Sequence, residues 1–461
     1  MISLKLFSRI RGYPPWVILL VLNLLVSLFF IFYILYRGNQ PVYDIGDELE
    51  YRRLAINLIQ GNGYSLSYAY PFKPTMQREP LYPFLLAISY LLFGYNDMPI
   101  YLFQIVLHAL TAIIIFYLTL SISDNRGIAW CAAVFTSLSP SLVDISLFIM
   151  TETVFTFLLA LDLLIAAKAL KNNSFKLFIA LGLLLGITTL CRAVGIFLVP
   201  IIILLLFIQN KQRAVRYALI MLLIFTFTIS PWLIRNKIIS GRFQFNTKGS
   251  EVLWDMTSGL DSSNKELFAT MVASFSDSLG RRLYKTQLEN VLGRNNMANN
   301  LYRSQQRIDE ISTDKLYFSK AIEKISKKPL KYFILSLINL VRYNPNFSVM
   351  YVFKRRDLSL MSTVSALSYD FPIIDKIIMM IFKASFFLIL ILMLKGMFFV
   401  RKELKNWILP ISVIIYFNFL HALVSSAPRH NFPVQPYYFM FAAVAMQRVY
   451  MKYRDSARIK I

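Results

Sequence analysis

The sequence predicts an all-α protein that crosses a membrane about ten to twelve times. Of its 461 residues, 57% are hydrophobic and only 16% are charged, whereas a soluble domain averages about 25% charged residues. Residues 12–36 and 98–123 carry no charge, and each run exceeds the roughly 20 apolar residues that a helical span needs. A net charge of +24 fits a membrane protein whose cytoplasmic loops are rich in lysine and arginine.

Ten apolar segments are candidate spans. The first is too long for the apolar region of a signal peptide, and it lacks a cleavage site of small residues. The later ones are separated mostly by short polar turns. They cover residues 12–36, 98–123, 127–144, 146–167, 177–191, 193–210, 217–234, 377–394, 406–424 and 432–447.

Basic residues indicate the orientation. If the N-terminus is cytoplasmic and the spans alternate, the cytoplasmic segments hold nineteen lysines and arginines, and the short external turns hold only Arg192 and Arg429. Lysine and arginine concentrate in short cytoplasmic loops. We therefore expect both termini in the cytoplasm of a multi-pass protein, in a plasma membrane such as the bacterial inner membrane.

Two long segments are then external, which divides the chain into three parts. The N-terminal membrane module, 1–234, contains the first external loop, 37–97. An external subdomain follows at 235–376, and the C-terminal spans occupy 377–461.

Both external segments contain expected helices near the membrane. Residues 48–59 place Leu54, Ala55 and Leu58 at helical spacing, which predicts a helix on the membrane surface. The apolar run 81–93 is either a second surface helix or a short span. Pro329 opens an amphipathic stretch, 330–343, which lies on the surface or dips into the membrane.

The sequence lacks the motifs of several classes of soluble enzyme and binding protein. The chain has no GxxxxGK[ST] phosphate loop and no HExxH zinc motif. Cys131 and Cys191 lie in apolar runs and form no CxxC pair. The basic residues do not alternate with aromatic residues as in a nucleic-acid patch, so nucleic acid is not an expected partner.

Charged residues gather instead at the external ends of the spans. Charges at the edge of the apolar slab are costly and are functional by default. Some of these residues also have a structural interpretation: Arg235 and Arg429 could contact lipid headgroups, and Arg192 could pair with Glu152. The set is Asp44, Asp47, Glu48, Glu50, Arg52, Arg53, Arg78, Glu79, Glu152, Arg192, Arg235, Arg429 and His430.

These residues predict an external pocket of carboxylates and arginines facing the membrane. Carboxylates suit a general base, and the arginine fork suits a phosphate. A phosphate at a membrane surface suggests a lipid phosphate as substrate.

The same motifs resemble the GT-C superfamily of integral-membrane glycosyltransferases. The chain is similar to dolichyl-phosphate-mannose protein mannosyltransferases and to the bacterial aminoarabinose transferase of lipid A. The motifs occur in family order, and the first two are the most specific. They are GDELEY at 46–51, REPLYPFLLA at 78–87, LLFG at 91–94, SLSP at 137–140, MTET at 150–153, LCRAVG at 190–195, SPWLIRN at 230–236 and PRHNFPVQP at 428–436.

The resemblance implies transfer of a sugar from a polyprenyl phosphate to an acceptor on the external face, usually with inversion. The acidic pair Asp47 and Glu48 would be catalytic, with Asp47 as the base. Glu152 would be the acidic residue of the second external turn. Arg78, Arg235 and Arg429 match the basic residues that hold the lipid phosphate.

The chain departs from the aminoarabinose transferase at two positions. Glu50 stands where that enzyme has an arginine, and Glu79 where it has a lysine. Arg52 is therefore a further candidate for the phosphate. Glu79, Tyr82 and His430 are expected in the substrate pocket.

Cofactor, partners and rival functions stay open at this level. No cofactor is certain; a divalent metal could bind Asp44, Asp47 and Glu152. The expected partners are a polyprenyl-phosphate sugar, a glycan, lipid or protein acceptor, and membrane lipids. The alternatives are a lipid-linked glycan flippase or transporter, an O-antigen polymerase or ligase, and a membrane scaffold.

Overall fold

The computed structural model describes residues 14–36, 46–209, 211–275, 280, 282–291, 310–344, 373–424 and 428–459. Over these residues the protein is helical, and the one extended feature is an isolated bridge between Ser65 and Pro74. The predicted all-α membrane fold is confirmed.

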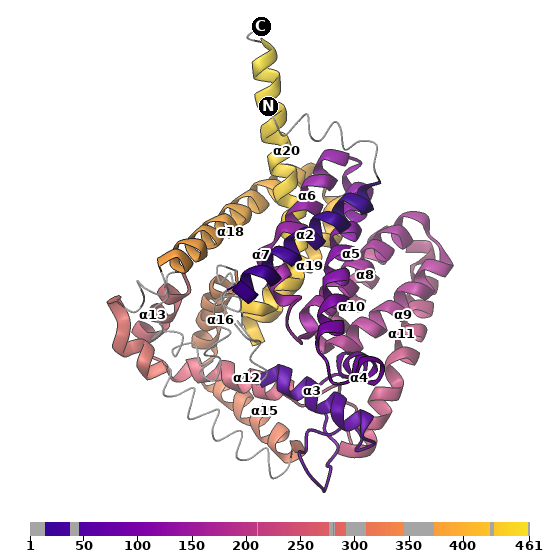
Figure 1. Cartoon of the computed structure of the whole chain (residues 1–461), viewed down its shortest axis with the longest axis vertical. Helices are drawn as coiled ribbons and strands as arrows, with labels where there is room; N and C mark the ends of the chain where they lie inside the picture. The colour runs from indigo at the N-terminus through magenta and orange to yellow at the C-terminus, as the bar shows by residue number, and fades with distance from the viewer. Residues whose placement is uncertain are drawn as a thin grey trace.

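Six described helices are long and apolar enough to cross a membrane, and four shorter apolar helices accompany them. The membrane bundle is built from long helices with short connections (Figure 1). Its elements are α2 (Pro15–Tyr36), α5 (Met98–Ser123), α6 (Arg126–Leu138), α7 (Pro140–Ile145), α8 (Thr151–Asn172), α9 (Phe175–Cys191), η2 (Ala193–Phe197), α10 (Leu198–Gln209), α11 (Lys211–Ser240), α18 (Ile373–Phe399), η6 (Val400–Lys402), α19 (Leu404–Val424), η7 (Pro428–Val434) and α20 (Gln435–Ile459).

The boundaries of the expected spans 127–144 and 146–167 were wrong. The first is divided into α6 and α7, because Pro140 has no N–H to continue a helix and sits at the start of α7. The second begins only at Thr151. Between α7 and α8, the buried Gln104 side chain donates hydrogen bonds from Nε2 to the carbonyls of Ser146 (3.0 Å) and Phe148 (2.7 Å). This satisfies non-helical backbone that lipid could not solvate.

Close helix packing holds the bundle together. α9 lies along α11, α5 packs against α6 and α8, and α18 lies along α20. Gly182 and Gly186 of α9 face α11, where an added Cβ would lie 2.5 Å from the Met221 carbonyl oxygen and 2.6 Å from the Thr228 side chain, respectively. Small residues of this kind let helices approach closely in a membrane, where apolar burial alone does not favour association.

The helices from the two segments expected to be external lie together at the end of the molecule opposite the C-terminal end of α20 (Figure 1). α3 packs against α4, α12 against α15, and α16 against α19. The helices are α3 (Gly46–Ile59), α4 (Leu81–Phe93), α12 (Lys248–Thr257), η3 (Ser258–Asp261), α13 (Asn264–Phe275), α15 (Glu310–Lys327) and α16 (Pro329–Tyr343).

The expected helices at 48–59, 81–93 and 330–343 therefore exist as α3, α4 and α16. α16 is amphipathic: Leu335 and Tyr343 are buried, whereas Leu330 and Phe333 are exposed. The C-terminal end of α16 reaches η7, because the Tyr343 hydroxyl donates to the His430 carbonyl oxygen (2.9 Å). The layer of helices that contains α16 is thus tied to the segment that carries Arg429.

Candidate active site

Asp47 lies in the first turn of α3. Gly46 precedes it with φ +41°, a left-handed backbone conformation that glycine adopts without strain. Two arginines from distant parts of the chain pair with the Asp47 carboxylate: Arg78 with one oxygen, and Arg429 with the other, through Nη2 at 2.5 Å. A single carboxylate thus joins the first external loop to the C-terminal region.

Arg78 also binds Glu50, one turn along α3 from Asp47, with Nη2 2.5 Å from Oε2. Its guanidinium lies 5.1 Å from the centre of the Tyr51 ring. The Tyr64 hydroxyl fixes the backbone of this segment by donating to the carbonyl oxygens of Arg78 and Glu79, both at 3.0 Å. Arg78 is therefore held rigidly between two carboxylates.

On the other side, Arg429 approaches Glu152 at the start of α8, with 3.8 Å between Nε and Oε1. The same Glu152 oxygen pairs with Arg192 at 2.8 Å. The result is an alternating chain of charges that we call the ionic cluster: Glu50, Arg78, Asp47, Arg429, Glu152 and Arg192. The structural pairing of Arg192 with Glu152 is present, and it lies within the same cluster as Asp47.

The electrostatics of the cluster keep Asp47 ionised. Burial alone would raise the pKa of this carboxyl, but the positive charges of Arg429 and Arg78, with a smaller contribution from Lys248, outweigh burial and hold the pKa well below its ordinary value. The pKa of Arg78 lies well above its ordinary value, because the charges of Asp47 and Glu50 outweigh the effect of its own burial. Both groups carry full charge at neutral pH.

His430 follows Arg429 and lies within the same buried region. Its ring stacks on that of His421, with 4.8 Å between the ring centres. Burial, then the charges of His421, Arg192 and Arg429, hold the pKa of His430 well below its ordinary value. His430 is therefore neutral at pH 7 and can accept or donate a hydrogen bond.

Two of the expected phosphate ligands lie outside the ionic cluster. Arg52 binds Asp97 at 2.8 Å. Arg235 donates to the Thr75 carbonyl oxygen (2.9 Å) and lies 4.6 Å from the centre of the Trp232 ring. In this structure both guanidinium groups brace the first external loop.

The remaining expected residues surround the cluster. Glu48 is buried and accepts a hydrogen bond from the Ile149 backbone N–H (2.8 Å). Glu79 accepts from the Ala193 N–H (2.8 Å) and from Asn246 Nδ2 (2.6 Å). The Tyr82 hydroxyl donates to Gln104 (2.9 Å). The Glu48 contact involves α3, which carries Asp47 and Glu50, and the Glu79 contact with Ala193 joins the chain neighbours of Arg78 and Arg192.

The sequence interpretation missed the role of Glu50. We took its carboxylate as a departure from a family motif, yet Asp47 and Glu50 are three residues apart on a helix and therefore share a face. That spacing, next to an arginine-containing loop, could have indicated a shared partner. Lys248 was also missed, because nothing in the polar segment 235–329 relates it to the first loop.

The described part of the chain contains no preformed metal site. No three of its His, Cys, Asp or Glu side chains lie close enough together to hold a metal ion. Asp47 and Glu152 are instead joined through Arg429. Asp44, the third expected ligand, lies outside the described residues.

Glu152 and Glu50 should differ in their importance for stability. The Glu152 side chain is 3% exposed and serves Arg192 and Arg429, whereas that of Glu50 is 27% exposed and shares Arg78 with Asp47. Breaking a buried pair leaves an uncompensated charge, so Glu152→Gln should cost about 3 kcal/mol or more of stability. Glu50→Gln should cost about 1 kcal/mol or less.

Thermal unfolding of the two purified variants in the same detergent measures this contrast. Equal loss of stability in both variants would mean that Glu152 is not the structural centre of the cluster.

Part of the chain matches the model of a known protein family. The model of the family described as dolichyl-phosphate-mannose-protein mannosyltransferase matches residues 73–234, a range that contains Arg78, Glu152 and Arg192. No curated protein matches the chain significantly.

Among solved structures, the chain is similar to the Archaeoglobus fulgidus oligosaccharyltransferase, whose crystal structure was determined as a complex with Zn and sulfate. The identity is 14%, the TM-score is 0.44, and the alignment covers 93% of this chain. The chain spans about half, 53%, of the length of that oligosaccharyltransferase.

The family match agrees with the motifs REPLYPFLLA, MTET and LCRAVG, all of which it contains. It points to an integral-membrane glycosyltransferase. The resemblance to dolichyl-phosphate-mannose-protein mannosyltransferases is thereby confirmed over residues 73–234.

Proposed function

We propose that the protein transfers a sugar from a polyprenyl phosphate to an acceptor hydroxyl, with Asp47 as general base. The observation that carries the proposal is a partly buried, ionised carboxylate held between two arginines, Arg78 and Arg429. A carboxylate can take the proton of a hydroxyl, and the arginines can bind a phosphate by forked hydrogen bonds.

The reaction follows from these roles. The acceptor oxygen attacks the anomeric carbon, and its proton passes to Asp47. The bond between the anomeric carbon and the phosphate oxygen breaks, and the polyprenyl phosphate leaves with the bonding electrons. Arg78 and Arg429 stabilise the negative charge of the leaving phosphate. A single displacement of this kind inverts the anomeric centre.

The low pKa of Asp47 gives the arginines a second role. In the free protein the two guanidinium groups make the carboxylate a weak base. When a donor phosphate binds, its charge competes for the same guanidinium groups, and their hold on Asp47 weakens. The basicity of Asp47 therefore rises when the donor is present. Asp47 then takes the proton of the acceptor hydroxyl more readily than it does in the free protein.

The test is to incubate the purified full-length protein with several polyprenyl-phosphate sugars. Release of free polyprenyl phosphate with formation of a glycosylated product supports the proposal. Movement of intact donor across a reconstituted bilayer, without cleavage, would instead favour the flippase or transporter alternative.

The proposal also places the cluster on the external face of the membrane, with both termini cytoplasmic. Asn172 ends α8, at the opposite end of that helix from Glu152, and Ser240 ends α11 in the external layer. Reporter fusions at Asn172 and Ser240 should report the cytoplasm and the external side, respectively. Fusions that report the same side would overturn this topology.

A further inference from the structure

A pocket of about 630 Å³ lies in the external layer, between the segment that follows α11, the helices α12 and α15, and the end of α19. This volume falls within the roughly 300–1,000 Å³ of small-molecule sites. Nothing in the sequence motifs or in the ionic cluster uses it.

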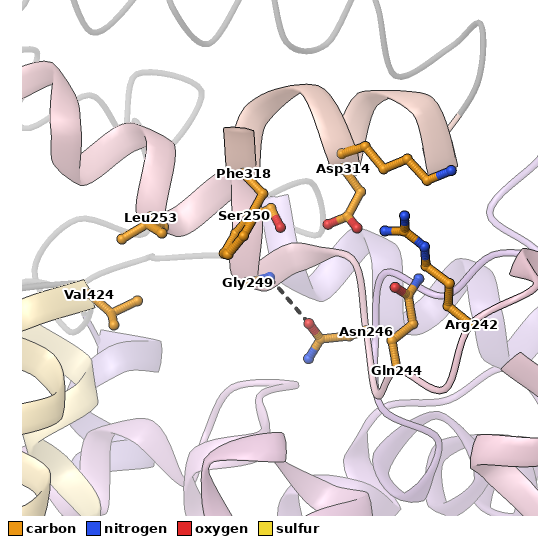
Figure 2. Close-up of a pocket in the computed structure, with 10 residues that line it drawn as sticks. Arg242, Gln244, Asn246, Gly249, Ser250, Leu253, Asp314, Phe318 and Val424 are labelled. Atoms are coloured by element: carbon orange, nitrogen blue, oxygen red, sulfur yellow. Dashed lines mark hydrogen bonds between the residues drawn. The ribbon is translucent and has the colours of Figure 1, made fainter. Parts of the chain in front are cut away.

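The pocket has a polar side and an apolar side. In Figure 2, Arg242 and Gln244 lie on one side and Leu253 and Val424 on the other. Figure 2 also shows Phe318 close to Ser250, between these two groups. The Phe318 side chain is 53% exposed, so its ring is available to a ligand.

The polar groups form a hydrogen-bonding wall. Ser250 hydrogen bonds to the Asp314 carboxylate, and the positive charge of Arg242 acts on the same carboxylate. Asn246 accepts from the Gly249 N–H (3.2 Å) through its side-chain oxygen. With Gln244, the wall thus offers amides, a carboxylate and a hydroxyl in one place.

The pocket adjoins the ionic cluster. Asn246 in its wall donates to Glu79 (2.6 Å), the neighbour of Arg78 in the chain. Lys248, between Asn246 and Gly249, is close enough to lower the pKa of Asp47. The pocket is thus joined through the Asn246–Glu79 hydrogen bond to the segment that carries Arg78.

We propose that this pocket binds the acceptor of the transfer reaction, and that the acceptor is a saccharide with a carboxylate or phosphate substituent. The inference rests on the proposed function. Sugar hydroxyls fit the amides, Asp314 and Ser250, and the apolar face of a sugar ring fits Phe318. Arg242 and Lys315 supply two cations against the single carboxylate of Asp314, which favours an anionic substituent.

A peptide acceptor fits these surroundings less well. Peptides commonly add to the edge of a sheet or lie as a helix in an apolar groove. The described residues that line the pocket belong to helices and a connecting segment, with no strand among them, and one side of the pocket carries Arg242, Gln244 and Asp314.

The test begins with binding of the detergent-purified full-length protein to an array of neutral, uronate-bearing and phosphorylated oligosaccharides and of peptides. The parent protein should bind anionic oligosaccharides. Phe318→Ala should weaken this binding at least about tenfold, through loss of the stacking ring. Arg242→Gln should remove the preference for anionic over neutral oligosaccharides.

Two matched controls lie on α15 outside the pocket. Ile322→Ala removes an exposed apolar side chain, as Phe318→Ala does, and Lys320→Gln removes an exposed basic side chain, as Arg242→Gln does. Both controls should leave binding unchanged. If no oligosaccharide binds, if the controls lose binding as much as the pocket variants, or if peptides bind in a Phe318-dependent manner, the proposal is wrong.

A second measurement separates this inference from the proposed function. Cleavage of a polyprenyl-phosphate sugar by water needs the ionic cluster but no acceptor, so the parent protein and the control Ile322→Ala should cleave the donor at the same rate. If the parent cleaves the donor while pocket variants keep the acceptor KM, the pocket assignment fails and the proposed function stands. If no donor is ever cleaved but oligosaccharides bind through Phe318, the pocket stands and the proposed function fails.

Discussion

Replacing Asp47 by asparagine is expected to lower the rate of sugar transfer by about 10²–10⁴-fold, the usual contribution of a positioned general base. Asparagine keeps the size of the side chain and removes its charge and basicity. The two carboxylate oxygens of Asp47 form ion pairs with Arg78 and Arg429. Another carboxylate could take over the role of base only if these side chains rearranged.

Folding should survive this substitution. Arg78 keeps Glu50 as a partner at 2.5 Å, and Arg429 keeps Glu152 at 3.8 Å. Binding of a polyprenyl phosphate should be unchanged or tighter in Asp47→Asn, because the phosphate no longer competes with a carboxylate for the two arginines. Loss of transfer with retained donor binding is the pattern that separates a base from a structural carboxylate.

The matched control is Glu48→Gln. The next residue on a helix points about 100° away, and Glu48 accepts a hydrogen bond from the Ile149 N–H outside the cluster. Its substitution should affect stability more than the rate of transfer by the folded protein. If Asp47→Asn transferred sugar at nearly the parent rate while Glu48→Gln did not, the assignment of the base would be wrong.

The pH dependence of Asp47 has a definite sign. The pKa of Asp47 in the folded protein is lowered well below its ordinary value, which is about 3.9. Its contribution to stability is therefore complete above the unfolded pKa, and it is lost only as the pH falls through the folded pKa. Between about pH 5 and 8 the kcat/KM of the parent should show no ionisation of this group.

The sequence was sufficient for the membrane helices because the length and polarity of a segment decide whether it can cross a bilayer. Met98–Ser123 is one unbroken helix, as its uncharged run predicts. The break between α6 and α7 was not anticipated, although Pro140 was visible. The irregular backbone between α7 and α8 was not anticipated either, because it depends on Gln104, a residue of a different helix, which donates to the carbonyls of Ser146 and Phe148.

The sequence predicts which charged residues lie near one another in the site, but not which arginine pairs with which carboxylate. Span topology places Asp47 and Arg429 at the same membrane edge, although 382 residues separate them. It does not say which arginine binds which carboxylate. Arg52 pairs with Asp97 and not with Asp47, because that partner follows α4 and α4 packs against α3. Such choices depend on tertiary packing, which no local pattern records.

Arg429→Ala should weaken binding of the polyprenyl-phosphate donor by about tenfold or more, since a hydrogen bond to a charged group contributes roughly 1.5–3 kcal/mol. The side chain of Arg429 is 26% exposed, compared with 9% for Arg78. Arg429 can therefore turn toward a ligand and be removed with a smaller loss of stability. Arg78→Ala would leave both Asp47 and Glu50 without their shared cation, and we expect it to impair folding as well as activity.

Donor binding by Arg429→Ala, Arg429→Lys and Arg235→Ala measures the effect directly. Lysine keeps the charge but loses the planar fork, so Arg429→Lys should be intermediate. Arg235 braces the first loop through Thr75 and Trp232, so Arg235→Ala should lower the unfolding temperature and leave the donor Kd of the folded protein unchanged.

The double variant Asp47→Asn, Arg429→Ala decides whether Arg429 binds the phosphate or only orients Asp47. If Arg429 contacts the phosphate, its removal should weaken donor binding even when Asp47 is already neutral, because the lost partner is the donor itself. If Arg429 only holds the carboxylate, its removal should have no effect on donor binding in the Asp47→Asn background. The second result would make Arg429 a positioning residue and leave Arg78 as the phosphate ligand of the site.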